Sequence, residues 1–201
     1  MAWLGADYEC LSTDTHEDLG SSLRALPTVL ARSLAADKAR AARIMRRDAG
    51  LIIAFDTIVV VDRRVLGKPA DVGEARGMLE TLSGRVHDVV TGCALLFDSE
   101  SEPTTFAVTT PVTMRDLDES TLEDWLAGSE ALGCAGAYNI ERHLATVEDG
   151  ECYQNVAGLP LCHLYERLVR RGVQGITPPR EACEEARGNE CPLGRRLCRT
   201  R

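Results

Sequence analysis

The sequence predicts an α/β fold in which helices flank a mixed, twisted sheet. Segments with the apolar pattern of strands interleave with segments whose apolar residues recur at helical spacing. Two strand-like segments, residues 86–96 and 104–114, are separated only by a polar turn, which predicts a hairpin. With 201 residues, the chain suits one domain and is long enough to bury a core.

The first third of the chain predicts two strands around one helix. Residues 8–11 alternate as a short strand, and a helix begins at Leu26-Pro27 and runs to about residue 47. Residues 51–55 form an almost continuous apolar run that ends in Asp56-Thr57, and residues 58–61 continue it. This pattern is typical of a central strand that is buried on both faces.

The remaining elements follow in the same alternation. We expect a loop at 67–69, helices at 72–82 and 118–126, a loop at 134–140, a strand at 144–147 and a helix at 159–170. These elements define one domain over residues 1–174. Residues 175–201 are rich in Pro, Glu, Arg and Gly, so we expect a disordered tail there.

Charge and hydropathy exclude several classes of function. The formal net charge is −8 and the pI is about 5.1, so the broad basic surface of a nucleic-acid-binding protein is absent. No apolar run approaches the length of a membrane span, and the N-terminal residues lack the pattern of a signal peptide. We therefore expect a cytoplasmic protein.

The eight cysteines fall into two groups. Five lie in apolar or strand-like stretches and are expected to be small buried hydrophobic residues: Cys10, Cys93, Cys134, Cys152 and Cys162. Cys183, Cys191 and Cys198 lie in the polar tail without a C-x-x-C spacing, which favours free thiols. A metal-binding or redox-sensing tail remains the alternative.

The best local signal for chemistry is Asp56-Thr57, with Lys68 following after a turn. A rigid strand holds a carboxylate in place, and a nearby lysine neutralises negative charge, as attack on a phosphate requires. An ordinary solvated Asp and Lys beside a turn would give the same pattern. Similarly, Glu17 with His16 and Asp14 suits either a metal ligand set or a solvated loop.

The order of several motifs is more specific than any one of them. The series comprises Asp56-Thr57, Leu66-Gly67-Lys68-Pro69, Leu79-Glu80-Thr81-Leu82-Ser83-Gly84-Arg85-Val86-His87, Val90-Thr91-Gly92, Ala135-Gly136-Ala137-Tyr138 and Gly158-Leu159-Pro160. It closely resembles the Maf family of nucleotide pyrophosphatases, which shares its fold with the inosine-triphosphate pyrophosphatases. The resemblance runs from about Trp3 to Val169.

The resemblance implies hydrolysis of a nucleoside triphosphate, such as dTTP, UTP or a modified nucleotide, to the monophosphate and pyrophosphate with Mg²⁺ or Mn²⁺. It also implies a house-cleaning role, a link to arrest of cell division and a homodimer. By position, Asp56 matches the family's proton acceptor and a metal contact, and Thr57 matches a specificity position. Lys38 matches a lysine that reaches the phosphates, Lys68 matches the lysine of the G-K-P motif, and Glu17 matches a metal or water contact.

The sequence departs from the family pattern at three places. The family's first strand and its S-x-R-R phosphate-binding loop have no counterpart before Trp3, and we expect a misplaced start codon to explain this. Phe55 stands where glycine is usual. Glu141 replaces a glutamine of the dTTP/UTP subgroup and, when ionised, only accepts hydrogen bonds. The alternative function is therefore a catalytically impaired member that binds nucleotide or regulates division.

Overall fold

The computed structural model describes residues 1–13, 15 and 22–199. Its five-stranded sheet has the order β2-β1-β3-β4-β5. The strands are β1 (Leu51–Val61), β2 (Arg64–Leu66), β3 (Val86–Phe97), β4 (Thr104–Met114) and β5 (Ala145–Thr146). The predicted α/β class with flanking helices is confirmed.

Within the described part of the chain, every strand pairing is antiparallel, so the expectation of a mixed sheet was wrong. Short connections account for two of the four pairings. β1 and β2 are joined by a two-residue turn, and β3 and β4 by the polar turn that predicted the hairpin. Such short connections join antiparallel neighbours, whereas parallel neighbours need a long crossover.

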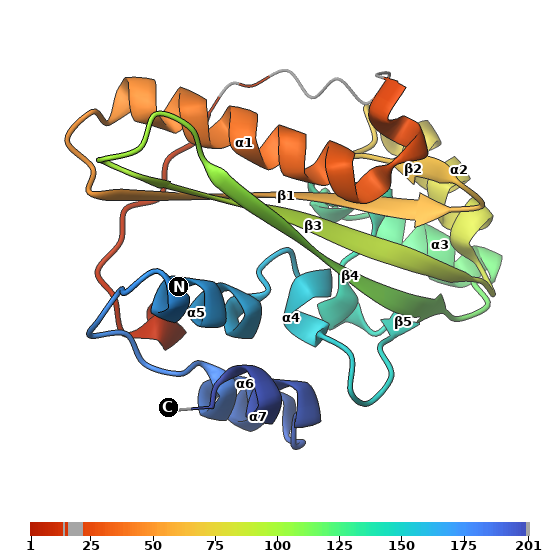
Figure 1. Ribbon diagram of the computed structural model, residues 1–201. Helices are drawn as coiled ribbons and strands as arrows, with labels where there is room; N and C mark the ends of the chain where they lie inside the picture. Colours follow the sequence, from red (N-terminus) through yellow and green to blue (C-terminus); the bar gives the residue numbers. More distant parts are fainter. Residues whose placement is uncertain (14, 16–21, 200–201) are drawn as a thin grey trace.

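The helices cover both faces of the sheet (Figure 1). α1 (Pro27–Met45) lies across one face, and α4 (Tyr153–Val156) and α5 (Leu161–Arg170) lie across the other. α2 (Val72–Leu82) and α3 (Glu119–Leu126) pack together at the far end of the strands. Short 3-10 helices occupy the connections: η1 (Ala2–Leu4), η2 (Ser22–Ala25), η3 (Glu130–Gly133), η4 (Ala135–Ala137) and η5 (Ile140–Arg142). No helix in the described ranges is long and apolar enough to cross a membrane.

α1 approaches the sheet unusually closely because small residues lie at the contact. Its buried face is rich in alanine, including Ala31, Ala35 and Ala39, each with no exposed surface. Beneath it, Gly92 of β3 lies so near that a Cβ atom there would overlap the carbonyl group of Ala31. The close approach brings the polar edge of α1 to the strand that carries Asp56.

β1 is an edge strand for most of its length, although we expected a central one. It pairs with β3 from Leu51 to Val60, but β2 covers its other side only at Val59–Val61. Among the described residues, no strand covers that side at positions 51–58. The backbone edge next to Asp56 is therefore accessible to a cavity.

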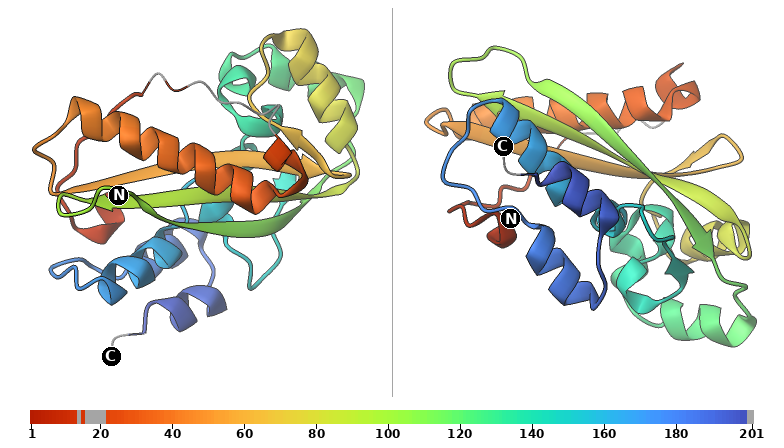
Figure 2. Two further views of the ribbon diagram at one scale, coloured as in Figure 1. Left: turned by 45° about the horizontal axis from the view of Figure 1, so that its top comes forward. Right: turned by 60° about the horizontal axis from the view of Figure 1, so that its bottom comes forward.

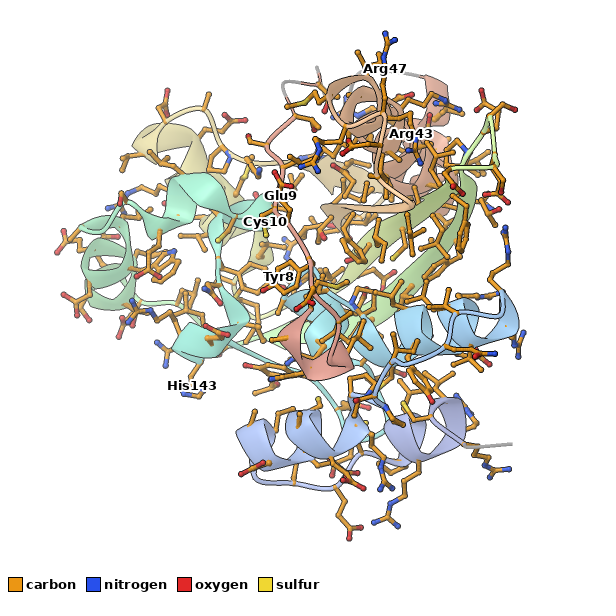
Figure 3. All side chains as sticks on the ribbon, turned by 90° about the vertical axis from the view of Figure 1, so that its left-hand side faces the viewer. Tyr8, Glu9, Cys10, Arg43, Arg47 and His143 are labelled. Atoms are coloured by element: carbon orange, nitrogen blue, oxygen red, sulfur yellow. The ribbon has the colours of Figure 1, made fainter. Side chains whose placement is uncertain are left out.

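The segment predicted as a strand at residues 8–11 is not one. After η1, whose Leu4 is buried against α5, the chain turns at Gly5 (φ +65°) and then runs irregularly towards α1. Figure 3 shows Tyr8, Glu9 and Cys10 on this stretch, and the Glu9 carboxylate pairs with Arg46 at the end of α1. The alternating pattern does not form a strand because no described strand lies beside it to complete the hydrogen-bond ladder.

Two helices occupy the segment for which we expected a disordered tail, which corrects that expectation. α6 (Arg180–Arg187) and α7 (Pro192–Leu197) lie beneath α5 and away from α1, as both views of Figure 2 show. A few apolar contacts hold these helices against the domain. Cys183 of α6 and Leu193 of α7 are buried, and Leu193 packs with Val108 of β4. The domain boundary at residue 174 stays a prediction.

We expect Gly92→Ala to lower the free energy of unfolding by about 3 kcal/mol, because the added methyl group would force α1 away from β3. The matched control is Gly77→Ala in the exposed face of α2, where a Cβ atom meets nothing within 4 Å. That substitution should stabilise the protein by about 0.5 kcal/mol. Urea denaturation of both variants measures the difference, and equal effects would contradict the close packing.

Candidate functional site

A cavity of about 360 Å³ lies at the open edge of β1. Three consecutive residues of the strand, Phe55, Asp56 and Thr57, contribute to its wall. Successive strand residues point to opposite faces, so only a cavity that reaches around the strand edge contacts all three. Its volume lies within the range of small-molecule sites.

The chemical centre of the cavity is the ion pair between Lys38 of α1 and Asp56 of β1. The Lys38 Nζ atom donates to Asp56 Oδ1. Asp56 is only 3% exposed, whereas the Lys38 side chain is 21% exposed. A buried carboxylate is costly unless a cation or hydrogen-bond donors compensate it, and Lys38 provides that compensation from the helix above.

Lys68 enters the same cavity from the loop after β2. The Gly67 carbonyl accepts a hydrogen bond from the Gly136 N–H (3.0 Å), which ties this loop to η4. Gly136 has φ +69°, and a Cβ atom there would crowd Val59 of β1 at 2.9 Å. Lys68 itself is exposed and makes no ion pair within the described ranges. It is thus an available cation at the mouth of the cavity.

A chain of hydrogen bonds fixes the orientation of the Thr57 hydroxyl. The Thr91 hydroxyl donates to the Asn155 carbonyl (3.1 Å), so its single proton is committed. Thr57 Oγ1 lies 2.9 Å from Thr91 Oγ1 and must therefore donate to it. As a result, Thr57 presents only lone pairs to the cavity.

The wall opposite β1 is formed by residues around η4 and η5. The Tyr138 hydroxyl lies 2.7 Å from His87 Nε2, and both side chains are buried. Burial lowers the pKa of His87 to about 4 and raises the pKa of Tyr138, so both groups are neutral near pH 7. Trp125 Nε1 donates to the Ala137 carbonyl (2.8 Å), which holds the same segment from outside.

The structure brings five sequence-predicted residues to this one cavity: Lys38, Asp56, Thr57, Lys68 and Glu141. Their roles stay predictions. Glu17, and His16 and Asp14 beside it, lie outside the described residues. In the ranges that the structure describes, no three His, Cys, Asp or Glu side chains are grouped to hold a metal ion. Phe55 contributes to the cavity wall and also packs against the apolar cluster around α5.

Sequence reasoning missed Asn155 and the contact between His87 and Tyr138. Asn155 is fully buried, and its Nδ2 donates to the Val89 carbonyl and to Thr110 Oγ1, both at 3.1 Å. It thereby joins α4 to β3 and β4 beneath the cavity. The only sequence signal for Asn155 was its position just before Gly158-Leu159-Pro160. Its hydrogen-bond partners, Val89 and Thr110, lie too far away in the sequence to be identified from it.

Comparison with known proteins agrees with the motif series. The family model described as "Maf-like protein" matches residues 1–171. A dTTP/UTP pyrophosphatase of Pelotomaculum thermopropionicum is 40% identical over 171 residues, covering 84% of this chain and 88% of the relative. Others, from Syntrophomonas wolfei (37% over 174 residues, 84% and 89%) and Ruminiclostridium cellulolyticum (38% over 168 residues, 81% and 84%), carry the same name. The chain belongs to the Maf family.

Proposed function

We propose that this protein hydrolyses dTTP and UTP to the nucleoside monophosphate and pyrophosphate. The observation that carries the proposal is the convergence of Asp56, Lys38 and Lys68 on one cavity. The names of the relatives, all dTTP/UTP pyrophosphatases, supply the substrate class. Hydrolysis of modified nucleotides stays a prediction of the family resemblance.

Binding of a triphosphate rearranges the charges of the cavity. The cavity lining carries two lysines, Lys38 and Lys68, and two carboxylates, Asp56 and Glu141. In a protein of net charge −8 it is therefore a local region of balanced charge, where the polyphosphate finds two cations. Lys68 meets the phosphates first because it is exposed. The phosphates then compete with Asp56 for the ammonium group of Lys38. The competition loosens the hold of Lys38 on the carboxylate, which makes Asp56 available as a base.

The reaction then needs one proton transfer and one bond exchange. A water molecule attacks the α-phosphorus, Asp56 takes a proton from that water, and the bond between the α-phosphorus and the bridging oxygen breaks. Pyrophosphate leaves with the electron pair of that bond. Lys38 and Lys68 stabilise the negative charge that develops on the phosphate oxygens.

A divalent cation, Mg²⁺ or Mn²⁺, fits this donor set. Mg²⁺ is commonly held by one or two carboxylates together with substrate phosphates, so a dedicated cluster of protein ligands is not required. Among the described residues, Asp56 is the candidate ligand of the cation. Glu17, which lies outside them, stays a further predicted ligand. When bound, the cation would neutralise phosphate charge.

The Thr57 hydroxyl favours a base that offers a hydrogen-bond donor. Its lone pairs match the single N–H of a thymine or uracil face, whereas the corresponding ring nitrogen of cytosine is an acceptor. Glu141, when ionised, also only accepts, which favours bases with additional donors. The two residues therefore act in opposite directions on the preference for dTTP and UTP.

The wider biological setting also stays proposed. Eight free cysteines fit the reducing cytoplasm. A house-cleaning role, a link to division arrest and a homodimer are predictions that the family resemblance suggests. The alternative function, that of a nucleotide-binding regulator, is tested by the first experiment below.

We expect Asp56→Asn to reduce kcat for dTTP about a thousandfold, because an amide cannot accept the proton of the attacking water. Lys38→Met should reduce kcat/KM about a hundredfold. The matched control is Asp62→Asn, because Asp62 lies exposed at the end of β1 and pairs with Arg85 (2.7 Å) outside the cavity. Pyrophosphate release is the readout.

Activity of Asp56→Asn within about tenfold of the parent would overturn the role of Asp56 as base. Tight binding of dTTP by the parent chain without turnover, measured by calorimetry, would instead favour the regulator.

We expect kcat/KM for dTTP and UTP to exceed that for dCTP by about tenfold, because one hydrogen bond of correct polarity is worth roughly that ratio. Thr57→Val removes the acceptor and should abolish the preference, whereas Thr57→Ser, the matched control, retains it. Glu141→Gln should strengthen it, because an amide also donates. Equal rates on dTTP, UTP and dCTP by Glu141→Gln would remove the role of Thr57, because that variant lacks the opposing effect of Glu141. An unchanged ratio between the parent and Glu141→Gln would remove the role of Glu141.

A further inference from the structure

A second cavity, of about 1040 Å³, lies where the start of α1 meets the turn between β1 and β2. Figure 1 shows β2 beside the beginning of α1 at one end of the sheet. Residues of η2, of the end of β1, of β2 and of the start of β3 complete its wall. None of these residues lines the cavity that contains Asp56. The proposed hydrolysis therefore assigns nothing to this second cavity.

Three arginines from two separate segments line the second cavity. Arg24 comes from η2, Arg63 lies in the turn after β1, and Arg64 begins β2. All three are exposed, and none forms an ion pair in the ranges that the structure describes. Because the protein has a net charge of −8, free arginines gathered in one cavity indicate a local site for an anion.

The other charged groups of the cavity do not cancel this positive charge. Asp62 pairs with Arg85 (2.7 Å), which lies outside the cavity lining. Asp88 is exposed and is not ion-paired with any described residue. Pro27, the first residue of α1, also lines the cavity, and the positive end of the helix has no side-chain cap there. The cavity thus combines an excess of cationic groups with one carboxylate that can accept hydrogen bonds.

The turn that carries Arg63 keeps this residue in an unfavourable backbone conformation. Asp62 has φ +47° and Arg63 has φ +64°, so both central residues of this two-residue hairpin turn are left-handed. Such turns favour Asp-Gly, because glycine adopts a positive φ without steric cost. The chain therefore has an arginine where a glycine would fold better, which is typical of a residue kept for its side chain.

The cavity also has an apolar wall. Val61 and Val65 line it and are buried, and Val86 lines it with 64% of its surface exposed. Exposed apolar surface inside a cavity is a site where a flat apolar group of a ligand gains from burial. The cavity therefore offers cations for an anionic group and apolar surface for a neutral one.

His87 adds a buried polar group to the lining of the same cavity. It is 3% exposed, and its Nε2 atom lies 2.7 Å from the Tyr138 hydroxyl. Its Nδ1 atom has no hydrogen-bond partner among the described residues. The Arg85 carbonyl opposes the lowering of the His87 pKa by burial, but it accepts its hydrogen bond from the Met114 N–H (2.9 Å). Nδ1 is therefore left for a polar atom of a ligand.

We propose that the second cavity binds a nucleoside phosphate, with the phosphate at the arginines and the base against the valines. The guanidinium groups of Arg63 and Arg64 donate to the phosphate oxygens, and Arg24 adds a third cation. The Asp88 carboxylate accepts hydrogen bonds from N–H or hydroxyl groups of the nucleoside. The site goes beyond the proposed hydrolysis and shares no lining residue with the first cavity.

The place of binding is tested on the full chain with 8-azidoadenosine monophosphate as a photoreactive probe. After irradiation and proteolysis, mass spectrometry should find the label on peptides that contain residues 60–66 or 86–88. Excess AMP should prevent this labelling. Label confined to residues 133–141, which contribute to the first cavity, would overturn the proposal, as would labelling that excess AMP does not reduce.

The role of Arg63 is tested by Arg63→Gly, with calorimetry of AMP, adenosine and pyrophosphate. The variant should bind AMP about tenfold more weakly, because it lacks a charge-assisted hydrogen bond to the phosphate. Its Tm should rise by about 2 °C, because glycine relieves the strain of the turn. A loss of binding in a stabilised protein cannot result from unfolding. The parent should bind AMP about tenfold more tightly than adenosine or pyrophosphate, because each of these has only part of the recognised groups.

The matched control is Arg47→Gln, which removes the same charge from an exposed arginine beyond the other end of α1 (Figure 3). It should leave AMP binding unchanged. Unchanged AMP binding by Arg63→Gly, or equal binding of adenosine or pyrophosphate by the parent, would overturn the proposal. These readouts do not depend on turnover, so a failure of the proposed hydrolysis would leave them unaffected.

Discussion

The buried ion pair between Lys38 and Asp56 is the contact on which the rest of the site depends. It joins a helix to a strand across a sheet face where an unpaired carboxylate would be costly to bury. The pair also contains the two functions that a phosphate-cleaving site requires, a base and a cation. In the proposed mechanism, structural stabilisation and chemistry therefore use the same two side chains.

The packing around the pair explains why it forms. Small residues at the contact of α1 with β3 bring Lys38 within reach of β1, and a bulkier residue at Gly92 would separate them. On the other face, Asn155 connects α4 to β3 and β4 and fixes the Thr57 hydroxyl through Thr91. The helix on one face of the sheet, α1, therefore supplies the charged group that pairs with Asp56. The helix on the other face, α4, determines that the Thr57 hydroxyl acts as a hydrogen-bond acceptor in the cavity.

Local patterns predicted most of the fold, because helical periodicity and apolar runs depend on near neighbours in the sequence. The helices at 27–45 and 72–82 and the hairpin of β3 and β4 are examples. The irregular stretch at 8–11, the antiparallel sheet and helices α6 and α7 were not predicted, because each depends on partners that are distant in sequence. For the same reason, the motifs identified Asp56 and Lys68 but not Asn155, whose partners lie on β3 and β4.

The most direct test of the central claim is the identity of the products formed from dTTP in oxygen-18 water. Phosphorus NMR of the reaction with Mg²⁺ separates cleavage at the α-phosphorus from cleavage at the γ-phosphorus. Water activated by Asp56 at the α-phosphorus predicts equal amounts of dTMP and pyrophosphate, with the label in dTMP alone. Formation of dTDP and phosphate, or label in the pyrophosphate, would contradict it.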